Sequence, residues 1–246
     1  MLSRNTPVAL VVGAAGFVGS CLTAKLLGKA IQVVGIDNLS TGPKENLSEA
    51  SKAKYFHFLH QNAEKPYQLD LPRLDYAYFT LAVNNNNEYL TALRLFLEFC
   101  KQFKPKIALV STIEVYDQHK NSAKVFQQAE KFLAHYAKDN QLNARIVRLA
   151  SLYGPRMRFN DDDPMSRLIQ ASLQSELQTQ SLSLDFTTRS LYIDDAIDLL
   201  IKAVFIGGTS HKIYDGALNT DTIIYSYNEQ KSRLNVLPVF NKEIPR

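Results

Sequence analysis

The apolar residues of this chain fall into short runs separated by amphipathic stretches. The first run, Val8–Val12, leads into glycines, an amphipathic stretch and a second apolar run that ends at Asp37. This order predicts a strand, a tight turn, a helix and a second strand. Further apolar runs predict strands at residues 55–59, 76–81, 107–111 and 144–149. Because unbroken apolar strands alternate with helical stretches, we expect a doubly wound α/β fold, a parallel sheet with helices on both faces.

Two of the helical stretches carry more apolar surface than one face of a sheet requires. Residues 124–139 place apolar side chains along a single broad stripe. Residues 88–103 are apolar on more than one side of the predicted helix. We therefore expect these two helices to form the interface of a dimer.

Composition and charge are those of one globular unit. The chain has 246 residues, of which 46% are hydrophobic, enough for a sizeable core. Its 28 basic and 24 acidic residues are scattered rather than clustered, which does not favour nucleic-acid binding. The run Val8–Val12 is too short to span a bilayer and only Arg4 precedes it, so we expect no signal peptide, no membrane partner and a cytoplasmic location.

The cysteines and histidines show no metal-ligand spacing. Cys21 and Cys100 each lie in an apolar helical pattern, which predicts buried thiols in a reducing compartment. The five histidines form neither of the paired-histidine motifs typical of zinc sites. We expect no metal site.

A glycine motif follows the first strand and suggests a nucleotide site. Gly13, Gly16 and Gly19 lie between a predicted strand and helix, where glycines allow a tight turn and close approach of a pyrophosphate. Asp37 ends the second strand, at the place where a carboxylate binds a ribose diol and repels a 2′-phosphate. The pattern therefore predicts a Rossmann-type site for NAD rather than NADP. Alternatively, the glycines serve packing only and the domain binds nothing.

Six motifs occur in the order of a known family. They are VVGAAGFVGS, IDNLSTG, LDYAYFTLA, STIEVY, RLASLYGPRM and RSLYIDD. On these motifs the chain resembles, over most of its length, the extended short-chain dehydrogenase/reductase family of NAD-dependent nucleotide-sugar epimerases, dehydratases and decarboxylases. YGPRM, the Asn/Asp-rich turn after it and TRSLYIDD are most similar to UDP-glucuronate decarboxylases, although related epimerases and dehydratases share much of this pattern.

The resemblance implies an NAD site and a UDP-sugar substrate. The implied cofactor residues form four sets: those around the pyrophosphate, those around the adenosine ribose, two beside the adenine and two at a strand end. They are Gly13, Gly16, Phe17, Val18 and Gly19; Asp37, Asn38, Ser40, Thr41 and Gly42; Asn62 and Ala63; Leu81 and Ala82. Asn62 replaces the usual aspartate, but its amide oxygen still accepts a hydrogen bond from the adenine amine. Thr80 stands where histidine is common.

The reactive pair of the family is missing. Its enzymes use a Tyr-x-x-x-Lys motif, in which the tyrosine takes a proton and the lysine holds the nicotinamide ribose. Aligning the usual downstream glutamate with Glu130 puts Ser122 at the tyrosine position and Phe126 at the lysine position. Serine is far less acidic than a phenol, and phenylalanine offers neither charge nor hydrogen bond. A shift of two residues brings Lys124 near the lysine position but supplies no tyrosine.

The segments around the implied active site are also short. Five residues separate Tyr116 from Ser122, where the family has a longer loop, and a second contraction follows Ala82. We expect a Rossmann-type NAD-binding domain in residues 1–155, with later segments returning to the sheet. Residues 156–246 then form a small, truncated substrate lobe.

Some residues implied in substrate chemistry remain. Thr112 and Glu114 match the Thr-x-Glu positions of the decarboxylases, and Arg189 matches an arginine near the substrate. A carboxylate in a cleft can titrate, and a guanidinium suits phosphate or carboxylate groups. Equally, Glu114 can be a strand-end carboxylate that accepts backbone hydrogen bonds, and Arg189 can pair with Asp185 or Asp194. Tyr116 is expected to be structural.

Three functions are therefore open. The leading hypothesis is an NAD(H)-binding protein with a degenerate active site, acting as a binding, sensing or partner subunit, either as a homodimer or with an active relative. The second is an active UDP-sugar enzyme that uses Glu114 or residues of a partner chain. The third is a dimeric structural protein that binds no nucleotide.

Overall fold

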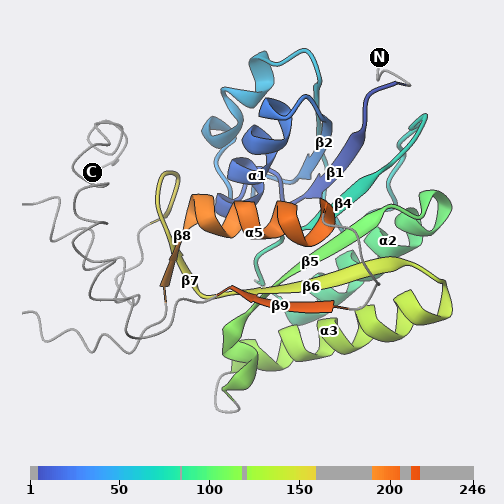
Figure 1. The fold of residues 1–246 in the computed structure, drawn as a ribbon, viewed down its shortest axis with the longest axis vertical. Coiled ribbons are helices and arrows are strands. Elements are labelled where there is room, and N and C mark those ends of the chain that lie inside the picture. The colour runs from blue at the N-terminus through green and yellow to red at the C-terminus, as the bar shows by residue number, and fades with distance from the viewer. Residues whose placement is uncertain (1–4, 84, 118–120, 159–189, 206–211, 217–246) are drawn as a thin grey trace, which may run out of the picture.

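The computed structural model describes residues 5–83, 85–117, 121–158, 190–205 and 212–216 (Figure 1). Their centre is a seven-stranded parallel sheet in the order β3-β2-β1-β4-β5-β6-β9. The strands are β1 Val8–Val12, β2 Gln32–Asp37, β3 Phe56–His60, β4 Tyr76–Phe79, β5 Lys106–Thr112, β6 Asn143–Leu149 and β9 Lys212–Gly216. The chain therefore builds outwards from β1 in one direction and then, from β4, in the other. The crevice between β1 and β4 is the point where such sheets bind ligands.

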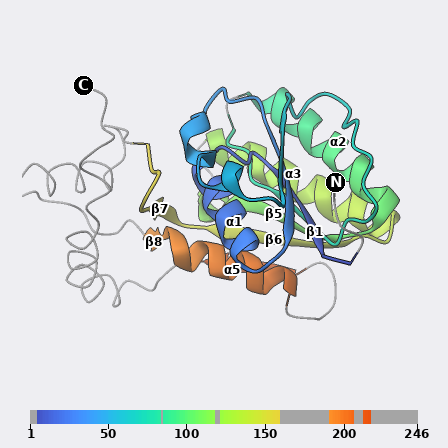
Figure 2. The same cartoon turned by 90° about the horizontal axis from the view of Figure 1, so that it is seen from above.

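Helices cover both faces of this sheet (Figure 2). On one face, α1 (Phe17–Gly28) packs against α5 (Ile193–Phe205), and on the other α2 (Asn86–Phe103) packs against α3 (Asn121–Asp139). Each face buries its own hydrophobic core, because the fully buried strands point alternate side chains to opposite sides. Among the described connections there are three short 3-10 helices: η1 Lys44–Leu47, η2 Ala50–Lys52 and η3 Ile113–Tyr116.

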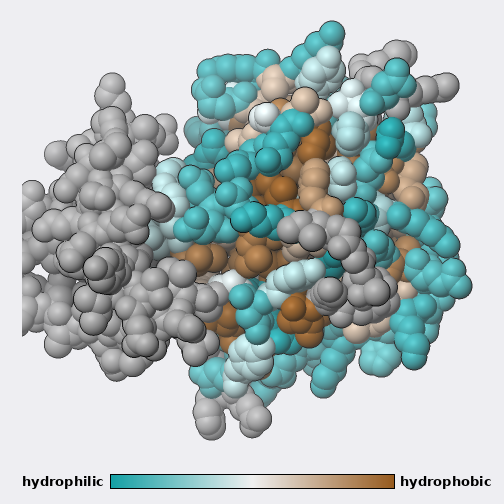
Figure 3. Space-filling model, in the orientation of Figure 1, coloured by the Kyte–Doolittle hydropathy of each residue, from teal (hydrophilic) through white to brown (hydrophobic). Residues whose placement is uncertain are grey.

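The outer surface follows from the helix sequences. Asp194, Asp195 and Lys202 on α5 are exposed, whereas Ala196, Leu200 and the other core-facing residues of that helix are buried. On the face drawn in Figure 3, hydrophilic side chains form most of the rim and hydrophobic ones gather towards the middle. Within the described ranges, no helix is long and apolar enough to cross a membrane.

The predicted fold is confirmed, with small shifts at element ends. The structure has a doubly wound sheet, and β3, β5 and β6 each start one residue away from the predicted position. β4 ends at Phe79, two residues before its predicted end. Helix α3 begins at Asn121, three residues before the predicted start. The prediction relied on the apolar stripe, which the polar residues of the first turn do not continue. Cys100 is buried as expected, but Cys21 is only half-buried.

The two-sided apolar pattern of residues 88–103 has an explanation within the chain. Helix α2 contacts both β4 and α3, so Phe96 and Leu97 as well as Tyr89 and Leu93 are buried. Its N-terminus is fixed by Asn85, whose side chain accepts hydrogen bonds from the Asn87 and Glu88 amides. Part of the apolar surface assigned to a dimer interface is therefore core.

The segments after residue 155 partly return to the main sheet. Helix α5 covers one of its faces and β9 is its edge strand. A separate two-stranded parallel sheet joins β7 (Ser151–Tyr153) to β8 (Ser190–Tyr192). Most of the predicted substrate lobe lies outside the described residues, so the division at residue 155 stays a prediction.

Candidate functional site

A cleft opens at the carboxyl ends of the central strands. Its volume is about 530 Å³, and the segments that line it are the glycine turn, the loop after β2, the ends of β4 and β5, α3 and the segment after β7. The lining residues are Gly13, Gly16, Phe17, Val18, Asp37, Thr41, Gly42, Pro43, Asn46, Thr80, Leu81, Ala82, Val110, Ser111, Phe126, Leu152, Arg156, Met157 and Arg158. We call this the larger cleft.

The glycine turn leaves no room for side chains. Gly13 has a φ of +89°, a conformation that residues with a Cβ rarely adopt. A Cβ on Gly19 would lie 1.9 Å from the Gly13 carbonyl oxygen. Thr80 holds the turn from β4, because its Oγ1 donates to the Val12 carbonyl oxygen at 2.8 Å. This closely packed turn brings backbone to the floor of the cleft, as a pyrophosphate site requires.

Asp37 is fixed at the end of β2. Its side chain is 5% exposed; Oδ2 accepts a hydrogen bond from the Ala15 amide at 2.9 Å and Oδ1 one from the Leu39 amide at 2.7 Å. These bonds tie the glycine turn to the loop after β2. Because a carboxylate accepts about four hydrogen bonds, capacity remains for a ribose diol.

A smaller cavity of about 70 Å³ adjoins the larger cleft and shares Asp37, Thr41, Leu81 and Ala82 with it. The other lining residues are Asn38, Ser40, Asn62, Ala63, Glu64, Asn85, Glu88, Tyr89 and Ala92. The Asn62 Oδ1 accepts a hydrogen bond from the Glu64 amide at 3.1 Å, which leaves one of its two lone pairs for a ligand.

The structure brings the predicted cofactor residues together. All of them line one or both cavities except Gly19, which lies behind the turn and serves its packing. Sequence reasoning missed Asn85, which caps α2, and Glu88 and Tyr89 on that helix, because the family pattern carried no signal there. It also gave Arg156 and Arg158 no role, although Arg156 lies inside a quoted motif.

The wall formed by α3 is apolar. Phe126 is half-buried and lines the larger cleft with Val110 and Leu152. Its ring lies 5.6 Å from the Tyr89 ring in an edge-on arrangement. Ser122 belongs to the same helix one turn earlier, but its side chain lies outside the described residues. At the position where the resemblance implies a lysine, the cleft therefore presents an aromatic ring.

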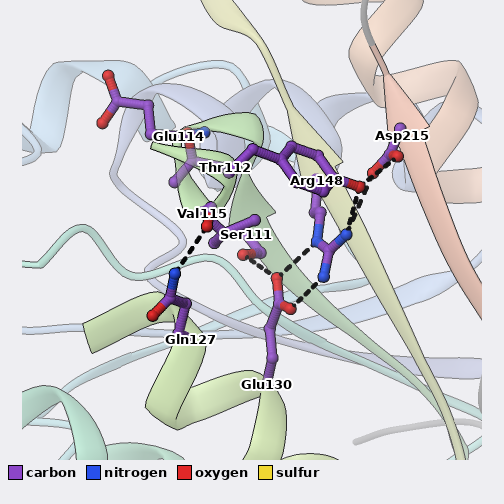
Figure 4. Close-up of polar contacts among 9 residues, drawn as sticks. Ser111, Thr112, Glu114, Val115, Gln127, Glu130, Arg148 and Asp215 are labelled. Atoms are coloured by element: carbon purple, nitrogen blue, oxygen red, sulfur yellow. Dashed lines mark hydrogen bonds and ion pairs between the residues drawn. The ribbon is translucent and has the colours of Figure 1, made fainter. Parts of the chain in front are cut away.

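Behind this wall, Glu130 and Arg148 form a paired cluster (Figure 4). Arg148 donates from Nε to Glu130 Oε1 at 2.9 Å and from Nη2 to Oε2 at 2.6 Å, and the Ser111 hydroxyl donates to Oε1 at 2.6 Å. The Glu130 carboxylate raises the pKa of the Arg148 guanidinium above its usual range, chiefly through these hydrogen bonds. The Glu130 carboxylate and the Arg148 guanidinium thus neutralise each other's charge.

The cluster continues to the surface through Tyr116. Arg148 Nη1 donates to the Tyr116 hydroxyl at 2.6 Å, and that hydroxyl donates to Asp215 Oδ2 at 2.8 Å. The hydrogen bond to the Asp215 carboxylate is the main cause of a raised Tyr116 pKa. Tyr116 links η3 to β6 and β9, in agreement with the structural role expected for it.

Two residues implied in substrate chemistry, Thr112 and Glu114, are in the described part of the chain but do not line the cleft. The Thr112 hydroxyl accepts a hydrogen bond from the Glu114 amide at 3.1 Å and caps η3. Figure 4 shows the Glu114 side chain pointing away from Glu130. Neither Thr112 nor Glu114 is among the described residues that line the two cavities. Arg189 lies outside the described residues.

Metal-binding side chains do not gather in the described part of the chain. No group of three or more His, Cys, Asp or Glu residues there could hold a metal ion.

The fold and the position of the cleft define a Rossmann-type α/β protein. Residues 9–206 match the NAD dependent epimerase/dehydratase family. The chain belongs to this family, and the resemblance predicted from its six motifs is confirmed.

Curated relatives at low identity include UDP-glucuronic acid decarboxylases. Decarboxylase 1 of Xenopus tropicalis is 26% identical over 225 residues, covering 78% of this chain and 52% of that protein. Decarboxylase 3 of Arabidopsis thaliana is 27% identical over 223 residues, covering 78% of this chain and 65% of that protein. The chain thus spans 52% to 65% of the length of these two relatives.

Solved structures support the same fold. A UDP-glucuronic acid 4-epimerase from Bacillus cereus in complex with NAD superposes with a TM-score of 0.73 at 24% identity, covering 92% of this chain and 83% of that one. The Bordetella bronchiseptica enzyme WbmF in complex with NAD+ superposes with a TM-score of 0.74 at 19% identity, covering 94% and 80%. At these identities the likeness establishes the fold.

Proposed function

We propose that this chain binds NAD(H) without performing the redox step usual in its family, and acts as a binding, sensing or partner subunit. One observation supports this function: the two ends of the larger cleft are equipped differently. The end beside β1 and β2 has a close-packed glycine turn and the fixed Asp37 carboxylate. The end beside α3 has Phe126, Val110 and Leu152.

The cofactor fits the first of these ends. Gly13, Gly16, Phe17 and Val18 would hold the pyrophosphate, and Asp37 the adenosine ribose. NAD, when bound, supplies a hydride acceptor. The redox step also needs a proton acceptor beside the hydride acceptor. Ser111 lines the cleft on β5, but its hydroxyl already donates a hydrogen bond to Glu130.

Calorimetric titration with NAD and with ADP-ribose tests this function. Loss of the lysine's charge-assisted hydrogen bond removes roughly 1.5–3 kcal/mol from NAD binding. We therefore expect NAD and ADP-ribose to bind with similar affinity. Much tighter binding of NAD would mean that the nicotinamide end is functional, and binding of neither would leave a structural protein.

The alternative function is an active nucleotide-sugar enzyme. Supporting it, the curated decarboxylases match 78% of this chain. Thr112 and Glu114 also match the Thr-x-Glu positions that the resemblance implies. In this case Glu114 or a residue of a partner chain would replace the missing tyrosine. Turnover of UDP-glucuronate that Glu114→Gln abolishes would establish this function and overturn the first one. A UDP titration tests the nucleotide site separately.

We also propose that α2 and α3 form a dimer interface, with a second copy or with an active relative. Leu90 on α2 and Phe132 and Tyr136 on α3 stay only partly buried against the core. Sedimentation should show a dimer that Phe132→Glu disrupts. A monomer at all concentrations would exclude the homodimer, and mixing with the active relative would then test the heterodimer.

A further inference from the structure

The segment after β7 brings two arginines to the mouth of the larger cleft. Arg156 and Arg158 line it together with Gly16 and Gly42. Asp37 is the only carboxylate among the described residues that line this cleft, and both of its oxygens already accept backbone hydrogen bonds. The mouth therefore carries an excess of positive charge, which attracts an anion.

Arg158 reaches across the cleft. Its Nη1 donates to the Thr41 carbonyl oxygen at 2.7 Å, although the two residues are 117 positions apart in the sequence. Arg158 is exposed, so this bond to a neutral acceptor competes with water. A phosphate oxygen is a stronger acceptor for a guanidinium than a carbonyl oxygen is, because both partners are then charged.

Arg156 occupies a backbone position that favours glycine. The Met157 amide donates to the Gly154 carbonyl oxygen at 3.2 Å and closes a four-residue turn, and Arg156 at its third position has a φ of +72°. In such turns a residue with positive φ at that position is usually glycine. An arginine kept at a strained position beside a cleft points to a use for its side chain.

Arg156 lines the larger cleft together with Gly16, Phe17 and Val18, which lie where α1 begins. Burial raises the pKa of the Cys21 thiol on this helix, and the Arg156 guanidinium partly offsets that rise. No side chain of the described residues caps the α1 N-terminus, and its first turn carries no acidic residue.

We propose that Arg156 and Arg158 bind the diphosphate of the nucleotide ligand, and that Arg158 exchanges the Thr41 carbonyl for a phosphate oxygen when the ligand enters. The inference rests on the proposed function for the presence of a nucleotide in this cleft. The chemistry recognised is a diphosphate ester, which a dinucleotide and a nucleotide sugar both contain.

Calorimetric titration of Arg158→Met with ADP-ribose, UDP and adenosine tests the assignment. We expect affinity for the diphosphate ligands, ADP-ribose and UDP, to fall about tenfold, because the variant loses one partly exposed charge-assisted hydrogen bond. Adenosine binding should not change. Arg94→Met is the matched control, because Arg94 is exposed on α2 and lines neither cavity.

Arg156→Gly gives a second readout that a merely structural arginine would not give. Removing the strain should keep or raise the unfolding temperature, while affinity for the diphosphate ligand falls. Loss of affinity only together with loss of stability would overturn the assignment of Arg156.

Titrations with the different ligands distinguish failure of this inference from failure of the proposed function on which it rests. Wild-type affinity for ADP-ribose and UDP in both arginine variants would overturn the inference and leave the proposed function standing. Arginine-dependent binding of UDP alone would support the diphosphate site and overturn NAD(H) binding. Binding of none of the ligands by the wild-type protein would overturn both.

Discussion

The two ends of the cleft differ in what their polar groups do. Beside β1 and β2, backbone and the Asp37 carboxylate are fixed by local hydrogen bonds and still have capacity for a ligand. Beside β5 and α3, the polar groups of Ser111, Glu130 and Arg148 bind one another, and Phe126 faces the cleft. The polar groups at one end of the cleft are thus available to a ligand, whereas those at the other end are paired within the chain.

The largest expected effect comes from Gly19→Ala. The new Cβ would lie 1.9 Å from the Gly13 carbonyl oxygen, so the turn must move. We expect a loss of about 3–4 kcal/mol in the free energy of unfolding, measured by urea denaturation. The control is Gly28→Ala at the end of α1, where a Cβ meets nothing within 4 Å. Equal stability of the two variants would contradict the close packing of the turn.

The next effect concerns the other end of the cleft. Arg148→Met leaves Glu130, 7% exposed, with only the Ser111 hydroxyl as a partner. We expect a loss of about 2–3 kcal/mol of stability with little change in ADP-ribose affinity. The double variant Arg148→Met/Glu130→Leu should recover much of the stability, because neither charge is then left unpaired. A large loss of ADP-ribose binding in folded Arg148→Met would show that the two ends are coupled.

Asp37→Asn tests the ribose contact at the binding end. The amide keeps one acceptor oxygen for the backbone but loses the negative charge. NAD affinity should fall by about 2 kcal/mol, some thirtyfold, and the preference for NAD over NADP should shrink. Glu45→Gln, a similar change at an exposed site outside both cavities, should leave titration with either dinucleotide unchanged.

The smallest effect sharpens the comparison at α3. Phe126→Lys should tighten NAD binding relative to ADP-ribose by about 1 kcal/mol, some fivefold, through a hydrogen bond to the nicotinamide ribose. Phe126→Met, which keeps an apolar side chain, should leave that ratio unchanged. An unchanged ratio in both variants would mean that the nicotinamide ribose does not lie beside α3.

The parts of the fold that depend on neighbouring residues could be predicted from sequence. The β1–α1–β2 unit, its glycine turn and Asp37 lie within one short segment, so periodicity and glycine spacing determine them. The same reasoning placed the strands within one or two residues, because each is a single buried apolar run.

Contacts between distant segments could not be predicted in this way. Arg148 on β6 pairs with Glu130 on α3. Tyr116 on η3 donates a hydrogen bond to Asp215 on the edge strand β9, and Arg158 donates one to Thr41. No local pattern records such pairs, since each depends on how the strands are ordered in the sheet. The same limit explains why Thr112 and Glu114 do not line the cleft, although Ser111, just before them in the sequence, does.

The strand order also has a consequence for synthesis of the chain. β1 is made before the other strands of its sheet, yet it is a central strand that pairs with both β2 and β4. Its second edge stays open until residues 38–75 have left the ribosome and β4 emerges. Long-range parallel pairing of this kind slows folding and exposes a strand edge meanwhile. The nascent chain thus exposes an unpaired edge of β1, at which another chain could pair, until β4 is available.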